Sequence, residues 1–205
     1  MTLHNRDTFE AIYAGKKPPW DIGKPQPVFV AVADRVTGAV LDAGCGTGEN
    51  ALFFAGRGHP VLGIDFLEGP IQQARRKAHE RGLNAEFAQL DALTLDSLER
   101  RFDTVIDCGL FHVFSDEDRA RYVAGLTHVT LPGGRLFLLC FSDAEPGTQG
   151  PRRVSQDELR SAFAHGWNIE AIRPERFETR PDLEEHITFS EGGPKAWLAL
   201  LRRHG

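Results

Sequence analysis

The stretch Val40-Leu-Asp-Ala-Gly-Cys-Gly-Thr-Gly-Glu-Asn50 constrains the fold of this chain more than any other. A short apolar run ends near Asp42, glycines follow at 44, 46 and 48, and residues 51–55 have helical character. Glycines let the backbone turn sharply and let a ligand approach it closely. A strand, a glycine loop and a helix in this order offer backbone amides and a helix N-terminus to a nucleotide-like ligand. The sequence therefore predicts a cofactor site here.

Strands and helices are predicted to alternate along the rest of the chain. The expected strands are 39–42, 61–64, 85–88, 102–108, 135–141, 167–177 and 196–202, and the main expected helices are 5–14, 25–35, 70–81, 95–101, 116–129 and 156–164. This alternation predicts an α/β fold with a mostly parallel sheet of about seven strands, covered by helices on both faces.

No linker-like stretch divides the chain, so residues 1–205 are expected to form one domain. Residues 1–36 would be an arm and helix that cover the site. Residues 37–142 would form the cofactor-binding core, and residues 143–205 would supply a second covering loop and the C-terminal strands.

Four aspartates lie near successive predicted strand ends: Asp42, Asp65, Asp91 and Asp107. Ligands of such sheets bind at the carboxyl ends of the strands, and an acidic residue at the end of the second strand accepts hydrogen bonds from ribose hydroxyls. Asp65 suits that role. Dinucleotide binders require G-x-G-x-x-G, however, and here Glu49 takes the place of the third glycine.

Five ordered motifs resemble those of class I S-adenosylmethionine-dependent methyltransferases: Asp42-Ala-Gly-Cys-Gly-Thr-Gly48, Gly63-Ile-Asp65, Asp91-Ala92, Phe102-Asp-Thr-Val-Ile-Asp107 and Leu131-Pro-Gly-Gly134. The segments 19–27 and 153–155 are similar to the branch that contains thiopurine, thiol and halide methyltransferases. The resemblance implies a single Rossmann-like three-layer αβα sandwich. Its seven-stranded sheet would have the order 3-2-1-4-5-7-6, with the last strand antiparallel.

The resemblance also implies the cofactor and its contacts. S-adenosylmethionine would be the methyl donor, with Asp42 near its amino group, Asp65 on the ribose and Phe66 against the adenine. The residues expected to contact it are Trp20, Asp42, Gly44, Cys45, Gly46, Thr47, Gly48, Asp65, Phe66, Asp91, Ala92, Asp107, Cys108 and Leu110.

Transfer of a methyl group from a sulfonium requires alignment more than acid–base chemistry, because the cofactor already carries the activated group. A general base is required only for an acceptor that arrives protonated with a high pKa. His112 is the best candidate for a base or for a group that orients the acceptor, although local packing is the alternative. The other candidate acceptor contacts are Trp20, Phe111, Phe114, Arg152 and Arg153, the two arginines being equally compatible with ion pairs.

Composition excludes several other classes. The net charge is −5 and the basic residues are dispersed, so no nucleic-acid surface is predicted. The three cysteines are widely spaced, which indicates packing roles in a reducing cytoplasm and no metal site. No apolar run suggests a signal peptide or a membrane span. We expect a cytoplasmic monomer.

The expected function is methyl transfer to a small, apolar or heteroaromatic acceptor with an oxygen, sulfur or nitrogen nucleophile. Two alternatives stay open. A nicotinamide-dependent oxidoreductase would be expected to contain a Tyr-x-x-x-Lys or similar pair, and neither Tyr13 nor Tyr122 is followed by Lys at that spacing. A non-catalytic protein that binds S-adenosylmethionine would have the same motifs.

Overall fold

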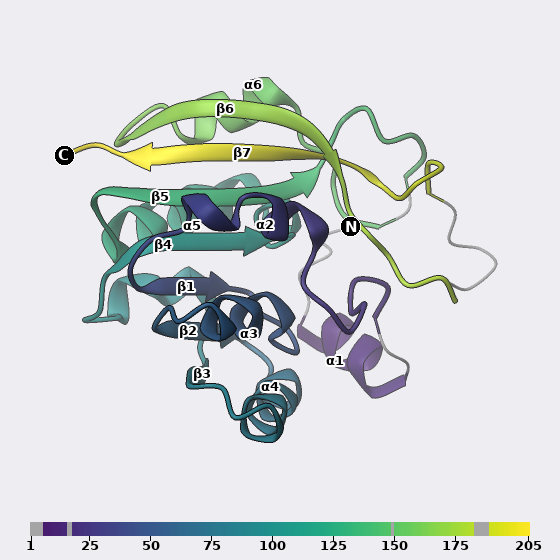
Figure 1. The fold of residues 1–205 in the computed structure, drawn as a ribbon. Helices are drawn as coiled ribbons and strands as arrows, with labels where there is room; N and C mark the ends of the chain where they lie inside the picture. Colours follow the sequence, from purple (N-terminus) through teal and green to yellow (C-terminus); the bar gives the residue numbers. More distant parts are fainter. Residues whose placement is uncertain (1–5, 16–17, 149, 183–188) are drawn as a thin grey trace.

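A computed structural model describes residues 6–15, 18–148, 150–182 and 189–205 of the chain. Across these residues, seven strands form a sheet with the order β3-β2-β1-β4-β5-β7-β6 (Figure 1). The strands are β1 (Val40–Ala43), β2 (Val61–Asp65), β3 (Ala85–Gln89), β4 (Phe102–Cys108), β5 (Thr130–Phe141), β6 (Trp167–Arg176) and β7 (Lys195–Arg203). β7 is antiparallel to both of its neighbours, and the pairs among β1 to β5 are parallel. The predicted strand order is confirmed.

Helices cover both faces of the sheet. One face packs against α2 (Pro27–Ala31), the short turn η1 (Ala33–Arg35), α3 (Glu49–Gly56) and α4 (Glu68–Glu80), and the other against η2 (Ala92–Ser97), α5 (Asp116–Val129) and α6 (Gln156–Ala162). Every residue of β1 and β2 is buried, which explains why their sequences, apart from Asp42 and Asp65, are apolar and do not alternate with polar residues.

Local signals place the helix starts where the sequence predicted them. The Ser115 hydroxyl accepts a hydrogen bond from the Asp118 amide at the start of α5. At α6, Ser155 and Glu158 form a reciprocal capping box, with both side chains accepting a backbone amide of the other residue.

Three predicted boundaries differ from the structure. The helix expected over 25–35 is divided between α2 and η1 at Val32, and the helix expected over 95–101 is instead the 3₁₀ segment η2. The turn predicted at 132–134 lies inside β5, because an irregularity in the pairing with β4 accommodates it without ending the strand. Side-chain patterns do not report such changes in strand register.

The N-terminal part lies beyond the carboxyl ends of the parallel strands, where α1 (Arg6–Gly15) is drawn in purple in Figure 1. The proline-rich segment that follows is fixed to the chain after β6. The Arg180 amide donates to the Pro19 carbonyl (3.0 Å), and the buried Gln26 side chain exchanges two hydrogen bonds of 2.9 Å with the Glu178 backbone. Segments far apart in sequence therefore meet at this end of the sheet.

Of the helices in the described part of the chain, none combines the length and apolar character that a membrane span requires.

Candidate active site

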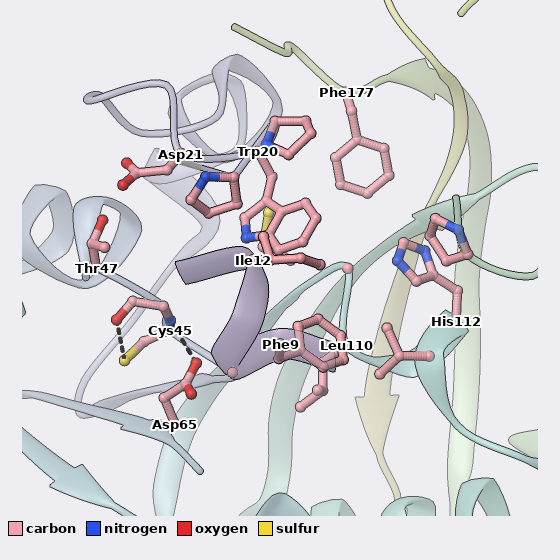
Figure 2. A pocket seen from close by; sticks show the side chains of 18 of the residues that line it. Phe9, Ile12, Trp20, Asp21, Cys45, Thr47, Asp65, Leu110, His112 and Phe177 are labelled. Atoms are coloured by element: carbon pink, nitrogen blue, oxygen red, sulfur yellow. Dashed lines mark hydrogen bonds between the residues drawn. The ribbon is translucent and has the colours of Figure 1, made fainter. Parts of the chain in front are cut away.

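A pocket of about 1080 Å³ opens at the carboxyl ends of the parallel strands. Figure 2 shows Cys45, Thr47 and Asp65 on one side of it and His112 and Phe177 on the other, with Trp20 and Ile12 between the two groups. We call these two parts the glycine-loop end and the aromatic end. The volume lies at the upper limit of ordinary small-molecule sites, about 300–1,000 Å³, so the pocket can hold two ligands side by side.

The loop between β1 and α3 forms the glycine-loop end. Gly48 has a φ of +87° at the N-cap of α3, and a Cβ there would lie 2.8 Å from the Ala74 Cβ of α4. The loop is fixed to β2 by hydrogen bonds from the Cys45 amide to the Ile64 carbonyl (2.8 Å) and from the Gly46 amide to Asp65 Oδ2 (3.0 Å). Gly44 to Thr47 line the pocket, whereas Gly48, which was also predicted to contact the cofactor, does not.

Asp65 is the last residue of β2, and its carboxylate connects the glycine loop to the residue that precedes α4. Its Oδ1 accepts from the Leu67 amide at 2.9 Å, and its Oδ2 accepts from Gly46. Burial raises the pKa of the carboxyl above its usual value, while these amide bonds act in the opposite direction. The neighbouring Phe66 ring makes an edge contact with Phe9 of α1, with the ring centroids 5.7 Å apart.

Asp91 and Ala92 extend the glycine-loop end past β3. Asp91 is exposed, caps η2 by accepting from the Leu93 amide at 2.9 Å, and lines the pocket together with Ala92. Both residues line the same pocket as Asp65.

Asp42 and Asp107 are fully buried in the adjacent strands β1 and β4. Burial raises the pKa of each carboxyl to about 7. Asp42 Oδ2 accepts from the Ala51 amide (3.0 Å), and its Oδ1 has no hydrogen-bond partner in the described chain. Asp42, which was also predicted to contact the cofactor, does not line the pocket, and its Oδ1 is a buried acceptor whose hydrogen bonding no described residue satisfies.

The prediction that Asp107 lines the cofactor site needs correction. Its carboxylate accepts from the Leu110 amide (2.7 Å), the Phe111 amide (3.0 Å) and the buried Tyr122 hydroxyl (3.0 Å), and it does not line the pocket. Its acceptor positions are used internally because the chain turns back directly after β4. Asp107 holds the turn that presents Cys108 and Leu110, both of which do line the pocket.

A polar cluster of Glu49 at the start of α3, Lys77 on α4 and Arg81 directly after α4 supports the glycine loop, and it was missed from the sequence. Lys77 Nζ donates to the Thr47 hydroxyl (2.8 Å) and carbonyl (3.1 Å), and it pairs with Glu49 at 2.8 Å. Arg81 makes a two-pronged contact with Glu49 at 2.8 and 2.9 Å. These basic partners lower the pKa of Glu49 against the opposing effect of burial. The residue that departs from the dinucleotide pattern thus ties the loop to α4.

Aromatic rings form the other end of the pocket. Phe141, at the end of β5, lies 5.3 Å from Phe177 and 5.8 Å from Phe189, measured between ring centroids. The buried His112 imidazole lies 5.1 Å from Phe141 and 5.9 Å from Phe177. Phe114 also lines the pocket, as predicted.

Phe111 does not belong to this wall. It is the first residue of η3 (Phe111–Val113) and is fully buried. Its ring stacks on that of Phe163, with the centroids 5.7 Å apart, and the Arg119 guanidinium carbon lies 4.4 Å from its centroid. The prediction failed because successive residues of a 3₁₀ turn point in different directions, so His112 faces the pocket and Phe111 the core.

Arg152 and Arg153 do not line the pocket either, which favours the ion-pair alternative. Arg152 pairs with Asp116 and Glu158 at the surface. Arg153 donates to backbone carbonyls of its own loop, including Glu145 at 3.2 Å, and its guanidinium lies 5.2 Å from the Phe141 ring.

The covering segment at the N-terminus contributes Trp20, which is 41% exposed and lines the pocket. Its indole N–H donates to the Tyr13 hydroxyl at 3.3 Å, and its ring contacts Phe9 at 6.1 Å. Tyr13 in turn lies against the glycine loop, since its hydroxyl is 3.0 Å from where a Gly46 Cβ would be.

The cysteines are free thiols, and burial raises the pKa of Cys45, Cys108 and Cys140. Thiols that stay protonated fit the packing role expected for them. Across the described residues, no group of three His, Cys, Asp or Glu is placed to hold a metal ion.

Several lining residues were missed from the sequence, among them Phe9, Ile12, Asn50, Phe141 and Phe177. Phe141 and Phe177 lie at the ends of β5 and β6, so the rule that ligands bind at the carboxyl ends of strands could have found them. Nothing in the local pattern identifies Phe9 or Ile12.

Residues 40–134 match a family model described as a methyltransferase domain. The chain is 37% identical to the 2-heptyl-1-hydroxyquinolin-4(1H)-one methyltransferase of Mycobacteroides abscessus, over 94% of this chain and 88% of that protein. A solved structure described as "Conversion of a Disulfide Bond into a Thioacetal Group during Echinomycin Biosynthesis" is 39% identical, with a TM-score of 0.84 and coverage of 100% of this chain and 93% of the other. A protein named Probable thiol methyltransferase 2 from Arabidopsis thaliana is 28% identical over 81% of this chain and 74% of its own length.

These relatives show that the chain is a methyltransferase. They do not specifically show the branch that contains thiopurine, thiol and halide methyltransferases. The long match to the quinolone methyltransferase overturns the nicotinamide-dependent alternative that the glycine loop alone had left open. With the predicted sheet order also confirmed, the chain belongs to the class I S-adenosylmethionine-dependent methyltransferases.

Proposed function

We propose that this enzyme methylates a flat, largely apolar heteroaromatic molecule at an oxygen, sulfur or nitrogen atom. The observation that carries the proposal is the wall of Phe141, Phe177 and Phe189 in the same pocket as the glycine loop. Aromatic walls favour flat conjugated ligands, which stack on them or meet their edges. The similarity to a methyltransferase named for a hydroxyquinolone supports the same acceptor class.

The residues at the glycine-loop end fit S-adenosylmethionine, which carries an ammonium group, a carboxylate and a ribose diol. Asp42 Oδ1 is buried without a hydrogen-bond partner in the described chain, and a buried acceptor of this kind suits an ammonium donor. The Asp65 carboxylate would accept from the diol. The N-terminus of α3 and the loop amides favour the carboxylate.

Phe66 and Ala92 would hold the adenine, with Asp91 accepting from its amino group. All three line the pocket beyond Asp65. Trp20 and the other described residues of the segment 1–36 would cover the cofactor, since Trp20 and Phe9 contact each other by their rings and both line the pocket. The segment after β6 would cover the acceptor, since Phe177 to Arg180 line the aromatic end.

S-adenosylmethionine supplies a methyl group already activated on a sulfonium sulfur. The chain's own task is then to hold the acceptor atom in line and to exclude water. Correct placement of two reactants is worth up to about 7–11 kcal/mol. The two covering segments and the aromatic wall perform this task, and no covalent intermediate with the protein is required.

An acceptor screen tests the proposal. Purified protein with S-adenosylmethionine would be incubated with 2-heptyl-1-hydroxyquinolin-4(1H)-one, thiophenol and iodide, and the products followed by mass spectrometry together with release of S-adenosylhomocysteine. We expect methylation of the quinolone and weaker turnover of thiophenol. Methylation of iodide alone would contradict the heteroaromatic acceptor.

Calorimetry separates the remaining alternative, a protein that binds the cofactor without catalysis. We expect S-adenosylmethionine and S-adenosylhomocysteine to bind, with NAD and NADP as negative controls. Binding of the cofactor together with no turnover of any acceptor would favour the non-catalytic alternative.

A further inference from the structure

His112 is the residue at the aromatic end whose hydrogen bonding defines its chemical role. It follows β4 by four residues, and its side chain is 5% exposed. The Cε1–Nε2 edge of its ring faces Gly109, where a Cβ would lie 3.3 Å from Cε1 and 3.4 Å from Nε2. Both Gly109 and His112 line the pocket, and Figure 2 shows His112 on the same side as Phe177.

The other ring nitrogen is committed to the sheet. β4 ends at Cys108, and the Gly109 amide still donates to the Leu139 carbonyl of β5 at 2.9 Å. The next amide on this edge of β5 belongs to Phe141, and it donates to His112 Nδ1 at 2.9 Å. The imidazole thus takes the place of a strand carbonyl where β4 has left the sheet.

This hydrogen bond determines where the imidazole carries its proton. A backbone N–H can only donate, so Nδ1 must accept with its lone pair. A neutral imidazole with an accepting Nδ1 has its proton on Nε2. The opposite tautomer would bring the Nδ1–H and the Phe141 N–H face to face within 2.9 Å. The edge of the ring on the pocket side is therefore a donor.

We infer that the Nε2–H of His112 donates a hydrogen bond to an oxo or oxyanion oxygen of the acceptor and so orients it, and that His112 is not a general base. The inference rests on the proposed function, because it selects among flat acceptors those with a conjugated oxygen. The rings of Phe141 and Phe177 beside the imidazole fit the apolar part of such a molecule.

The orienting role limits which acceptors react. Because Nε2 has no lone pair to take up a proton, the nucleophilic atom must react without giving a proton to His112. An ionised hydroxyl, an ionised thiol or a neutral ring nitrogen satisfies this requirement. A 1-hydroxy-4-oxo heteroaromatic also satisfies it, because conjugation with the oxo group stabilises the ionised hydroxyl.

Two substitutions separate the functions of the two ring nitrogens. His112→Asn places an amide oxygen near Nδ1, which keeps an acceptor for Phe141 but removes the donor at Nε2. His112→Gln places an amide near Nε2, which keeps a donor but removes the acceptor for Phe141. We therefore expect Asn to be the more stable variant and Gln the more active one. Thermal unfolding and calorimetry with S-adenosylmethionine check that both variants fold and bind the cofactor.

The assay uses 2-heptyl-1-hydroxyquinolin-4(1H)-one with S-adenosylmethionine, with thiophenol as the acceptor that lacks an oxygen. We expect His112→Asn to lose about 10- to 100-fold in kcat/KM on the quinolone, the range for a hydrogen bond to a charged group. Its kcat/KM for thiophenol should fall less than about threefold, because thiophenol has no oxygen that could accept this hydrogen bond. His112→Gln should keep most activity on both, and the pH profile should keep its shape in either variant.

The outcomes distinguish this inference from the proposed function. Equal loss in both variants together with a changed pH profile would indicate a base, and full activity of His112→Asn would indicate a structural role; either result overturns the inference. Calorimetry of the quinolone with S-adenosylhomocysteine-bound protein provides a second measurement. If the wild type binds the quinolone but does not methylate it, the proposed function alone is overturned. If it does not bind the quinolone, both the proposed function and the inference are overturned. If His112→Asn and the wild type bind the quinolone with equal affinity, the inference alone is overturned.

Discussion

The two ends of the pocket are built on different principles. At the glycine-loop end, polar groups are already fixed by the protein itself: Asp65 by two amides, Thr47 by Lys77, and Glu49 by Lys77 and Arg81. At the aromatic end, Phe141, Phe177 and Phe189 provide shape and apolar surface, with His112 as a polar exception.

The difference follows from what each end must recognise. A cofactor with a fixed set of charged and polar groups binds well to donors and acceptors that are held in place beforehand, because less freedom is lost on binding. An acceptor that is flat and apolar is selected by the walls of the cavity, where one oriented donor can decide which way it lies. Substitutions at the two ends should therefore separate cofactor affinity from acceptor turnover.

The largest effect on cofactor affinity is expected from Asp65→Ala. It removes the acceptor that we propose for the ribose diol and frees the Gly46 and Leu67 amides. We expect S-adenosylmethionine affinity to fall about 10- to 150-fold, as for loss of a hydrogen bond to a charged group. Calorimetry measures it, with Asp65→Asn as a milder variant that keeps one acceptor oxygen.

The matched control at the other end is Phe177→Leu. It keeps apolar volume but removes the ring beside His112, so we expect lower kcat/KM for a flat acceptor with cofactor affinity unchanged. Unchanged affinity for S-adenosylmethionine in Asp65→Ala, or a large loss of that affinity in Phe177→Leu, would contradict the assignment of separate functions to the two ends.

A smaller effect is expected at the cluster behind the glycine loop. Lys77→Met removes three contacts, two to Thr47 and one to Glu49. The loop keeps its backbone bonds to β2, so we expect S-adenosylmethionine affinity to fall only about threefold to tenfold. Arg81→Met is the matched variant, since Arg81 contacts Glu49 and not Thr47. Its effect should be the smaller of the two, and the reverse order would show that Thr47 is not the point of support.

The last prediction concerns stability and not affinity, at Asp107, which links the two ends by holding the turn before His112. Burial raises the pKa of Asp107 to about 7 in the folded protein, above the ordinary value of 3.8. The folded state therefore retains a proton that the unfolded state releases, so stability falls as pH rises from about 4 to about 7 and then levels off. The loss has an upper limit of a few kcal/mol, because each tenfold difference in proton affinity corresponds to about 1.4 kcal/mol.

Thermal unfolding from pH 5 to pH 8 measures this effect. Wild-type protein should lose more stability over the range than Asp107→Asn, which keeps an acceptor for the Leu110 and Phe111 amides but does not titrate. Parallel curves for the two proteins would show that Asp107 does not titrate in this range.

The order of elements and much of the glycine-loop end were predictable from the sequence. Buried strands are mostly apolar runs, glycines with positive φ are needed at the turn, and aspartates come at strand ends; Gly44, Asp65 and Asp91, which these signals single out, line one pocket. Such features depend on the backbone and on chain order, which a linear pattern records directly.

Tertiary structure decided the rest. Whether a side chain near a strand end faces the pocket or the core depends on how the chain leaves the sheet, and so Asp107 and Phe111 are internal while His112 and Phe141 line the pocket. The proton position on His112 is also a tertiary property, because the Phe141 amide that fixes it is 29 residues away in sequence. The glycine loop identified one end of the pocket from the sequence alone, and we propose that the cofactor binds there. The acceptor end came from packing between distant segments, which no local pattern encodes.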